Sequence, residues 1–340
     1  MEDSAEGEVS RSVITDLGTL DGGAVSDAAD INDCGTVVGT SETDVDGAVF
    51  VHAVLWDADG DPHSLGTFRS DDRAESRATG VNDRGTVVGA AEGEDRVRRA
   101  FRRTEGGELE DLGSLGGSER GDSIAYDVND RETVVGQSDA GESEVRAFRW
   151  TGGEMEDLGT LRSDDTGQSG AFAVDNAGTV VGWSESDDGT NHAVRWTEAE
   201  GMEDLGMLED HGVSYAFDVT PHGTVVGRSY DPGAFDSRRA VRWVGGGVES
   251  LGTLDGDAGY SEAHGSNVRG VVVGDSRVGD VEHAFRWTEA EGMTDMGTLL
   301  DGDEGASTAS GVNARGDVVG ASRTPEGERH AVRWRVEDSR

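Results

Sequence analysis

Two sets of polar side chains recur at fixed places in the sequence and could form a ligand site. Seven serines spaced 45 to 50 residues apart are each followed two residues later by alanine, and three of these serines are followed four residues later by aspartate. Seven hydroxyls brought together could hold an anion, a water cluster or a sugar, and three carboxylates facing one channel could hold Ca²⁺ through oxygen ligands. The serines are Ser26, Ser76, Ser123, Ser169, Ser214, Ser261 and Ser307, and the aspartates are Asp30, Asp127 and Asp218.

Each set also has a purely structural explanation. Seven equivalent serines are more than any catalytic mechanism needs, whereas small side chains fit closely packed strands in which a serine can bond a neighbouring repeat. Aspartate commonly accepts hydrogen bonds from its own turn. We favour the structural interpretation of both sets and predict no cofactor, with Ca²⁺ at the three aspartates as the alternative.

Residues that interrupt the repetition are the remaining candidates for chemistry. His264 and Trp183 are the two that we select as candidate ligand-binding residues, because histidine can act as a base or a ligand. The sequence contains no Gly-x-Ser-x-Gly elbow, zincin motif or phosphate-binding loop. We therefore name no catalytic residue.

A repeat of 45 to 50 residues supplies the elements that would position these side chains. The motif Asn-Asp-x-Gly-Thr-Val-Val-Gly, with variations, ends at Gly39, Gly89, Gly136, Gly182, Gly227, Gly274 and Gly320. Each repeat contains four short strands: strand a with Ser-x-Ala, strand b with Val-Val-Gly, strand c with Arg-Trp, and strand d with Asp-Leu-Gly-Thr-Leu. Periods of this length built from short strands are typical of β-propellers. We predict an all-β, seven-bladed propeller of four-stranded antiparallel blades.

The order of the strands predicts how the ring closes. The chain begins with a strand d and ends with strands a, b and c of the seventh repeat. If residues 12–18 pair with residues 329–335, the N-terminal strand completes the last blade and leaves no open edge. We expect one propeller domain over residues 12–335, between an acidic N-terminal tail (1–11) and a C-terminal tail (336–340).

The repeated motifs resemble the HAF repeat family. The resemblance rests on segments such as Asp157–Leu161 (Asp-Leu-Gly-Thr-Leu), on the Val-Val-Gly motif and on the triplet His283-Ala284-Phe285, and it runs from about Ser12 to Trp334. It implies a β-propeller-like extracellular protein. The family has no established activity, so the resemblance leaves the function open.

The charge balance is extreme, with 70 acidic residues against 29 basic ones and a net charge of −41. Repulsion between such charges reaches about 30 Å in dilute salt but only about 3 Å in molar salt. We interpret the acidity, and the complete absence of lysine, as adaptation to a salty solvent such as a haloarchaeal cytosol. The charge also argues against nucleic acid and anionic membranes as partners.

No apolar run is long enough to span a bilayer, and residues 1–10 do not form a signal peptide. The chain as written is therefore expected in the cytoplasm, as a monomer without membrane insertion, whereas the family resemblance implies an extracellular location.

The lengths of the connections indicate which face binds a partner. The a–b turn is constant in length across the repeats, while the b–c and d–a connections vary and emerge together on the other face. Variable loops on a rigid scaffold commonly carry function. We predict a non-catalytic binding or scaffold propeller that takes a protein, peptide or glycan on the b–c/d–a face. The alternatives are a glycan hydrolase or lyase with an asymmetric site at the channel mouth, and a structural surface component.

Overall fold

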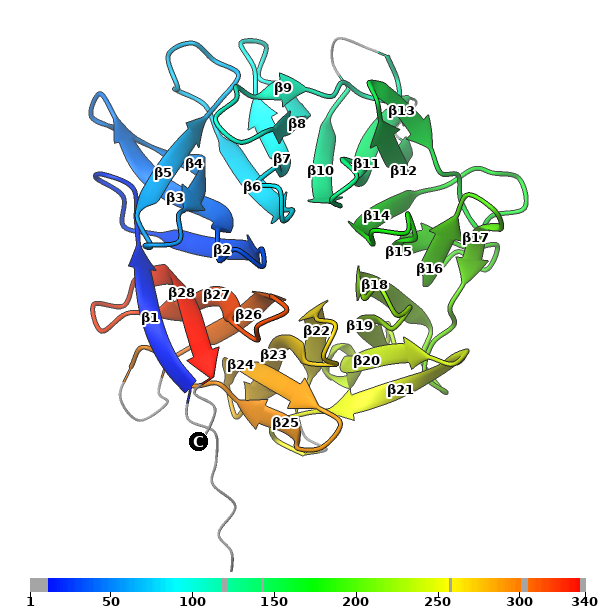
Figure 1. Ribbon diagram of the computed structural model, residues 1–340. Coiled ribbons are helices and arrows are strands. Elements are labelled where there is room, and N and C mark those ends of the chain that lie inside the picture. The colour runs from blue at the N-terminus through cyan, green and yellow to red at the C-terminus, as the bar shows by residue number, and fades with distance from the viewer. Residues whose placement is uncertain (1–11, 118–120, 142–143, 257–258, 301–304, 337–340) are drawn as a thin grey trace, which may run out of the picture.

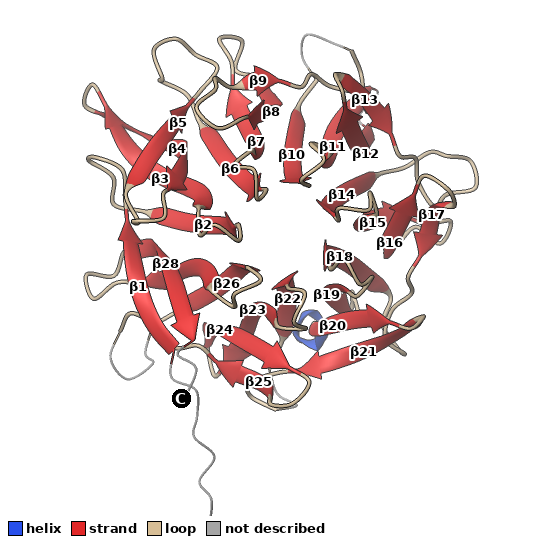
Figure 2. Ribbon diagram, in the orientation of Figure 1, coloured by secondary structure: helices blue, strands red, loops and turns tan. Residues whose placement is uncertain are grey.

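The computed structural model describes residues 12–117, 121–141, 144–256, 259–300 and 305–336. These residues form seven four-stranded antiparallel sheets arranged around a central axis (Figure 1). The described helical content is one short 3₁₀ helix, η1 (Phe235–Ser237), which Figure 2 shows near β20. The predicted all-β, seven-bladed architecture is confirmed.

We number the blades by the order of their innermost strands. Blade 1 contains β2 (Ser26–Ile31), β3 (Val37–Val45), β4 (Ala48–Trp56) and β5 (Pro62–Gly66). Blade 2 contains β6 (Ser76–Val81), β7 (Val87–Glu92), β8 (Arg98–Arg103) and β9 (Glu110–Asp111). Blade 3 contains β10 (Ser123–Val128), β11 (Val134–Gly141), β12 (Glu144–Thr151) and β13 (Glu154–Asp157). Blade 4 contains β14 (Ser169–Val174), β15 (Val180–Glu185), β16 (Asn191–Thr197) and β17 (Gly201–Asp204).

The remaining blades repeat this order. Blade 5 contains β18 (Val213–Val219), β19 (Val225–Tyr230), β20 (Arg239–Val244) and β21 (Gly247–Gly252). Blade 6 contains β22 (Ser261–Ser266), β23 (Val272–Val278), β24 (Val281–Thr288) and β25 (Gly292–Asp295). Blade 7 contains β26 (Ser307–Val312), β27 (Val318–Arg323), β28 (Arg329–Val336) and β1 (Ser12–Gly18).

The two ends of the chain meet in blade 7. Strand β1 pairs antiparallel with β28, with Ile14 opposite Trp334, and lies at the outer edge of the sheet (Figure 1). The predicted closure by the N-terminal strand is therefore confirmed. Strand β28 extends to Val336, while the predicted acidic tail, residues 1–11, and residues 337–340 lie outside the described part of the chain.

Each innermost strand contains a β-bulge at the same place, which the sequence analysis did not predict. In blade 4, Ala171 pairs with Gly182 and Ala173 with Val181, so that Phe172 has no partner. The register shifts in the same way in all seven innermost strands. A bulge re-aims a side chain. The seven unpaired residues all line one axial cavity: Ala29, Thr79, Tyr126, Phe172, Phe217, His264 and Ser310.

The glycine of the Val-Val-Gly motif is required by the close approach of strands a and b at this bulge. A Cβ atom on Gly182 would lie 1.9 Å from the carbonyl oxygen of Gly170, well inside van der Waals contact. The equivalent distance in the other six repeats is 1.9 or 2.0 Å. None of these seven glycines has a positive φ, so the space around the backbone, rather than its conformation, excludes every other residue.

The hydrophobic core lies between neighbouring blades. Val88 and Ala100 of blade 2 pack with Val134, Phe148 and Trp150 of blade 3, and comparable clusters join other neighbouring blades. Each blade therefore buries its apolar face only against another blade, which is why repeats of this kind are stable as a closed ring rather than singly.

Arginine side chains cover several tryptophans at the blade interfaces. The guanidinium carbon of Arg149 lies 4.7 Å from the centre of the Trp196 ring in the next blade. Equivalent contacts of 4.6 and 4.8 Å join Arg102 to Trp150 and Arg242 to Trp287. Cation–π contacts of this kind contribute about 0.5–2 kcal/mol each.

Candidate functional site

The seven repeated serines connect neighbouring blades. In blade 4, the Ser169 hydroxyl accepts a hydrogen bond from the Ala147 N–H of blade 3 at 3.0 Å and donates one to the Gly159 carbonyl at 2.8 Å. The same pair of bonds occurs in every blade. All seven residues are buried, with exposures of 0–4%. The seven residues are Ser26, Ser76, Ser123, Ser169, Ser214, Ser261 and Ser307.

These bonds agree with the structural interpretation of the serines, whereas a ligand-binding role for them stays a prediction. Each hydroxyl donates a hydrogen bond to a backbone carbonyl of the preceding blade and accepts one from a backbone N–H of that same blade. Removing it would leave a buried N–H and a buried carbonyl without partners, at a cost of about 1–3 kcal/mol for each. The recurrence of serine is explained by packing and hydrogen bonding within the scaffold.

Asp30, Asp127 and Asp218 lie in alternate blades and reach the axial cavity, as the sequence predicted. The carboxylate of Asp127 accepts one hydrogen bond from its neighbour Val128 (2.7 Å) and another from Val174 of the next blade (2.8 Å). Asp30 accepts hydrogen bonds from the Ile31 and Val81 N–H groups in the same way. Asp218 accepts them from the Val219 and Ser266 N–H groups. The predicted local bond is present, and a bond to the next blade accompanies it.

Nothing in this geometry forms a metal site. Within the described ranges, no group of three His, Cys, Asp or Glu side chains is placed to hold a metal ion. The three aspartates belong to blades 1, 3 and 5, and backbone N–H groups already contact both oxygens of each. The Ca²⁺ alternative stays a prediction without geometric support.

Burial raises the pKa of all three carboxyl groups. Desolvation raises the pKa of Asp30 to about 6, although two backbone hydrogen bonds oppose the change. Desolvation, together with the charges of Asp30 and Asp218, raises the pKa of Asp127 to about 7. The pKa of Asp218 is also raised, mainly by desolvation. The cavity therefore contains carboxyl groups whose pKa values are shifted towards neutral pH.

The Asp127 carboxyl is expected to make the protein less stable as the pH rises. Its pKa in the folded chain lies above the unfolded value of 3.8, so its contribution to stability is complete below about pH 4 and is lost by about pH 7. Relative to Asp127→Asn, which does not titrate, the wild type should lose about 2 kcal/mol across this range, allowing for water in the channel. Urea unfolding of both proteins at constant salt measures this; parallel pH profiles would contradict it.

The bulge residues make the axial cavity asymmetric. Blades 3 to 6 contribute Tyr126, Phe172, Phe217 and His264, whereas the other three blades contribute only small side chains. Adjacent rings are in contact, with centroids 5.1 Å apart for Tyr126 and Phe172 and 5.7 Å apart for Phe217 and His264. The cavity has a volume of about 210 Å³. One half of the channel wall is therefore aromatic and the other half is small and polar.

His264 belongs to a charged network in blade 6. Its Nε2 lies 2.6 Å from the Asp275 carboxylate. Burial lowers the pKa of His264, but the nearby charges of Asp275 and Glu262 outweigh this effect and raise the pKa above its ordinary value. Glu262 is itself buried and accepts hydrogen bonds from Arg228 at 2.7 Å and from Arg238.

Trp183 lies in the same sector, towards the b–c/d–a face. Its ring centroid is 5.9 Å from that of Tyr215, and the Arg228 guanidinium lies 4.7 Å from the Tyr215 ring. A Cβ on Gly170 would approach the Trp183 indole nitrogen to 2.5 Å, so glycine at this position makes room for the tryptophan. We call Trp183, Tyr215, Arg228, Glu262 and His264 the blade 4–6 cluster.

The structure thus brings together the two candidates that the sequence singled out and adds residues that the sequence analysis missed. Phe217 lies at the same repeat position as His264, and Arg228 at the same position as Trp183, so the sequence analysis selected one residue from each position and missed the other. The positions one and three residues after each repeated serine can be compared across the seven repeats. This comparison would have shown that aromatic side chains gather in consecutive repeats.

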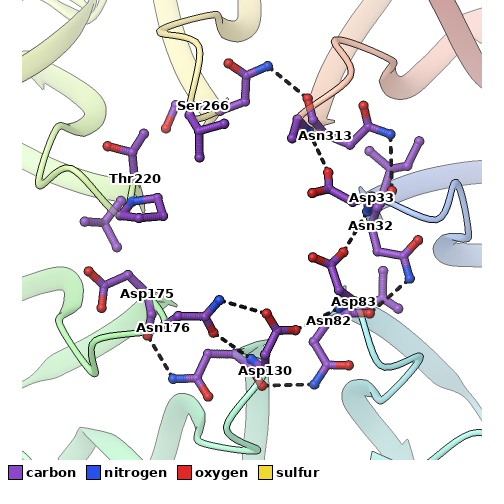
Figure 3. Close-up of a pocket in the computed structure, with 18 of the residues that line it drawn as sticks. Asn32, Asp33, Asn82, Asp83, Asp130, Asp175, Asn176, Thr220, Ser266 and Asn313 are labelled. Atoms are coloured by element: carbon purple, nitrogen blue, oxygen red, sulfur yellow. Dashed lines mark hydrogen bonds between the residues drawn. The ribbon is translucent and has the colours of Figure 1, made fainter.

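The opposite end of the axis is lined by the a–b turns (Figure 3). There, the Asn82 side-chain amide donates to the Asn129 backbone carbonyl of the next blade at 2.9 Å, and four other asparagines make the same bond. Asp175 and Thr220 replace asparagine in blades 4 and 5, so this belt is interrupted there. Hydrogen bonds therefore link most of the a–b turns, whose length is the same in every repeat, around an opening of about 270 Å³, the a–b mouth.

The part of the chain that the structure describes contains no helix long and apolar enough to cross a membrane.

Comparisons with known proteins show similarity of fold. A family model described as a protein of unknown function (DUF3466) matches residues 1–107 of the 340. No curated protein sequence matches the chain. A puromycin hydrolase structure superposes with a TM-score of 0.60 at 16% identity, covering 92% of this chain and 53% of that one. This chain therefore spans about half the length of the hydrolase.

A second solved structure is similar over almost its whole length. The β-propeller domain of the trilobed protease from Pyrococcus furiosus matches with a TM-score of 0.55 at 12% identity, covering 93% of this chain and 97% of that one. That domain is described as having an open velcro topology, whereas β1 and β28 pair here. At these identities the comparisons support one conclusion, which is that the chain has the fold of a β-propeller.

Proposed function

We propose that this protein is a binding propeller without catalytic chemistry, and that a peptide or glycan contacts its b–c/d–a face at the blade 4–6 cluster. The observation that carries the proposal is the asymmetry of an otherwise repetitive ring. Blades 4 to 6 combine aromatic rings, two arginines and a buried glutamate, whereas the equivalent positions of blades 1, 2 and 7 hold no aromatic side chain.

The chemistry of the cluster suits recognition rather than turnover. Trp183 and Tyr215 are partly exposed and offer flat apolar surfaces with polar edges, which are favoured at binding sites. Arg228 is held between the Tyr215 ring and the Glu262 carboxylate, so its orientation is set before a ligand arrives. Preorganised groups of this kind lose little entropy on binding.

A hydrolytic alternative rests on the pair of His264 and Asp275. The short contact and the raised pKa of His264 fit a general acid or base. Glu262, the neighbouring carboxylate, is neutralised by Arg228 and Arg238, which leaves it poorly suited to act as a nucleophile. The hydrolase and protease among the similar structures share the fold alone with this chain, so we rank binding first.

Trp183→Ala is expected to reduce binding by about tenfold or more, because a central aromatic contact contributes at least about 1.4 kcal/mol. The measurement is a screen of oligosaccharide and peptide arrays with the wild type in 2 M KCl, followed by titration of the hits with both proteins. Val49→Ala is the matched control, since Val49 is an exposed apolar residue next to a b–c turn in blade 1.

Circular dichroism establishes that both variants are folded. Equal loss of affinity in the two variants would contradict the proposed site. Hydrolysis of nitrophenyl glycosides by the wild type, abolished by His264→Ala with the fold intact, would favour the hydrolase over the binding propeller.

A further inference from the structure

We infer that the axial cavity, which meets the blade 4–6 cluster at His264, binds a small alkylammonium cation. The cavity of about 210 Å³ lies between the bulges of the seven innermost strands. Its lining contains three carboxyl groups and three aromatic rings, and none of the described residues that line it is an arginine. This goes beyond the proposed function, which concerns a different face and a different ligand.

The aromatic wall supplies the first kind of contact. Tyr126 and Phe172 meet edge to face at 5.1 Å, and Phe217 lies 5.4 Å from Phe172. Arg228 approaches Phe217 to 5.4 Å but does not itself line the cavity. Aromatic rings attract a cation through their quadrupoles, and an alkylammonium ion loses less hydration than an inorganic cation when it enters an aromatic site.

The carboxyl groups supply the second contact. Asp30, Asp127 and Asp218 are fixed by backbone hydrogen bonds on both oxygens, so a cation would find them already oriented. Negative charge on Asp30 and Asp218 raises the pKa of Asp127, so the three carboxylates repel one another across the cavity. A cation in the cavity would relieve this repulsion.

The other titratable groups that face the cavity do not cancel this field. Tyr126 is neutral at ordinary pH, because burial raises its pKa further. His264 is the one basic group among the described lining residues, and its charge when protonated is paired with Asp275 outside the cavity lining. Asp83 adds negative charge from the a–b mouth.

The a–b mouth gives a cation a route into the cavity. The mouth and the cavity share the lining residues Ser266 and Val312, so they adjoin along the axis. Figure 3 shows Asp33, Asp83 and Asp130 around one side of this mouth. Acidic groups at the entrance of a channel raise the local concentration of cations.

Binding of the cation is expected to release protons. A cation favours the ionised carboxylates, so it lowers their pKa and displaces protons where these groups titrate, between about pH 6 and 7 for Asp30 and Asp127. Affinity should therefore rise with pH through this range. A neutral ligand of the same shape would show neither effect.

The test is titration of the full chain in 2 M KCl with tetramethylammonium chloride and, as the neutral probe of similar shape, tert-butanol. Binding is followed by line broadening of the probe methyl signal, and proton release by calorimetry in two buffers of different ionisation enthalpy. We expect saturable binding of tetramethylammonium with proton release at pH 6.5 and no saturable binding of tert-butanol.

Variants separate the two contacts. Asp127→Asn and Phe172→Leu should each weaken binding by about tenfold, the second by removing the aromatic ring while keeping an apolar side chain. Ser310→Ala, which changes the small side of the same cavity, should leave the affinity within about twofold of the wild type. Trp183→Ala should also leave it unchanged, which distinguishes failure of this inference from failure of the proposed function.

Three results would overturn the inference: no saturable binding of tetramethylammonium, equal binding of tert-butanol, or an affinity unaffected by both Asp127→Asn and Phe172→Leu in proteins that circular dichroism shows to be folded.

Discussion

Gly227→Ala is expected to lower the stability of the propeller by more than about 4 kcal/mol and to prevent its folding in marginal conditions. The added Cβ would lie 2.0 Å from the Tyr215 carbonyl oxygen, across the bulge of blade 5. Because the collision is with backbone, a side-chain rotation cannot relieve it. Strands β18 and β19 would have to separate, which would also displace the bulge residue Phe217 from the axial cavity.

Gly247→Ala is the matched control in the same blade. Gly247 also lies in a strand, has no positive φ, and a Cβ there would meet only the Val244 carbonyl oxygen at 3.9 Å. Thermal and urea unfolding of both variants in 2 M KCl, followed by circular dichroism, measures the difference. Similar stabilities for the two variants would show that the close approach at the Val-Val-Gly glycine is not needed for the fold.

Transfer from molar KCl to less than about 0.2 M salt is expected to unfold the whole protein, as our second prediction of large effect. We propose that the net charge of −41 is an adaptation to a salty solvent. Among the described residues, many arginines already pair with acidic partners, as Arg102 does with Glu110 and Arg149 with Glu156. The 29 basic residues are too few to neutralise 70 acidic ones, so dissolved cations must screen the remaining carboxylates.

Circular dichroism and intrinsic tryptophan fluorescence during dialysis measure this unfolding. Sucrose at the same osmolality is the control, because it carries no charge and should not restore the fold, whereas added KCl should. A full β spectrum in plain water would refute the proposed adaptation. The same measurement in NaCl separates general screening from a specific need for potassium.

The fold was predictable from the sequence because its determinants are arranged along the chain. Seven returns of Val-Val-Gly count the blades, and the unmatched strand at Ser12–Gly18 indicates how the ring closes. These features need no knowledge of side-chain geometry. The predicted binding face was likewise read from loop lengths, and it stays a prediction.

The candidate site was predictable only in part. His264 and Trp183 differ from the residues at the same position in other repeats, and this difference identified them. Tyr126, Phe172 and Phe217 occupy the same variable position as His264, together with Ala29, Thr79 and Ser310, and only the histidine was selected from it. The bulge makes that position face the axis, and the bulge depends on the register between strands a and b.

The sequence by itself determined the number of blades, the four strands in each and the closing partner of the first strand, because periodicity and strand order are properties of the linear chain. Only the tertiary structure decided what the repeated polar residues do. It showed that the seven serines form hydrogen bonds between blades and that one variable residue from each blade lines the axial cavity. The physical reason is that burial, hydrogen-bond partners and pKa depend on neighbours from different repeats, about 46 residues away along the chain.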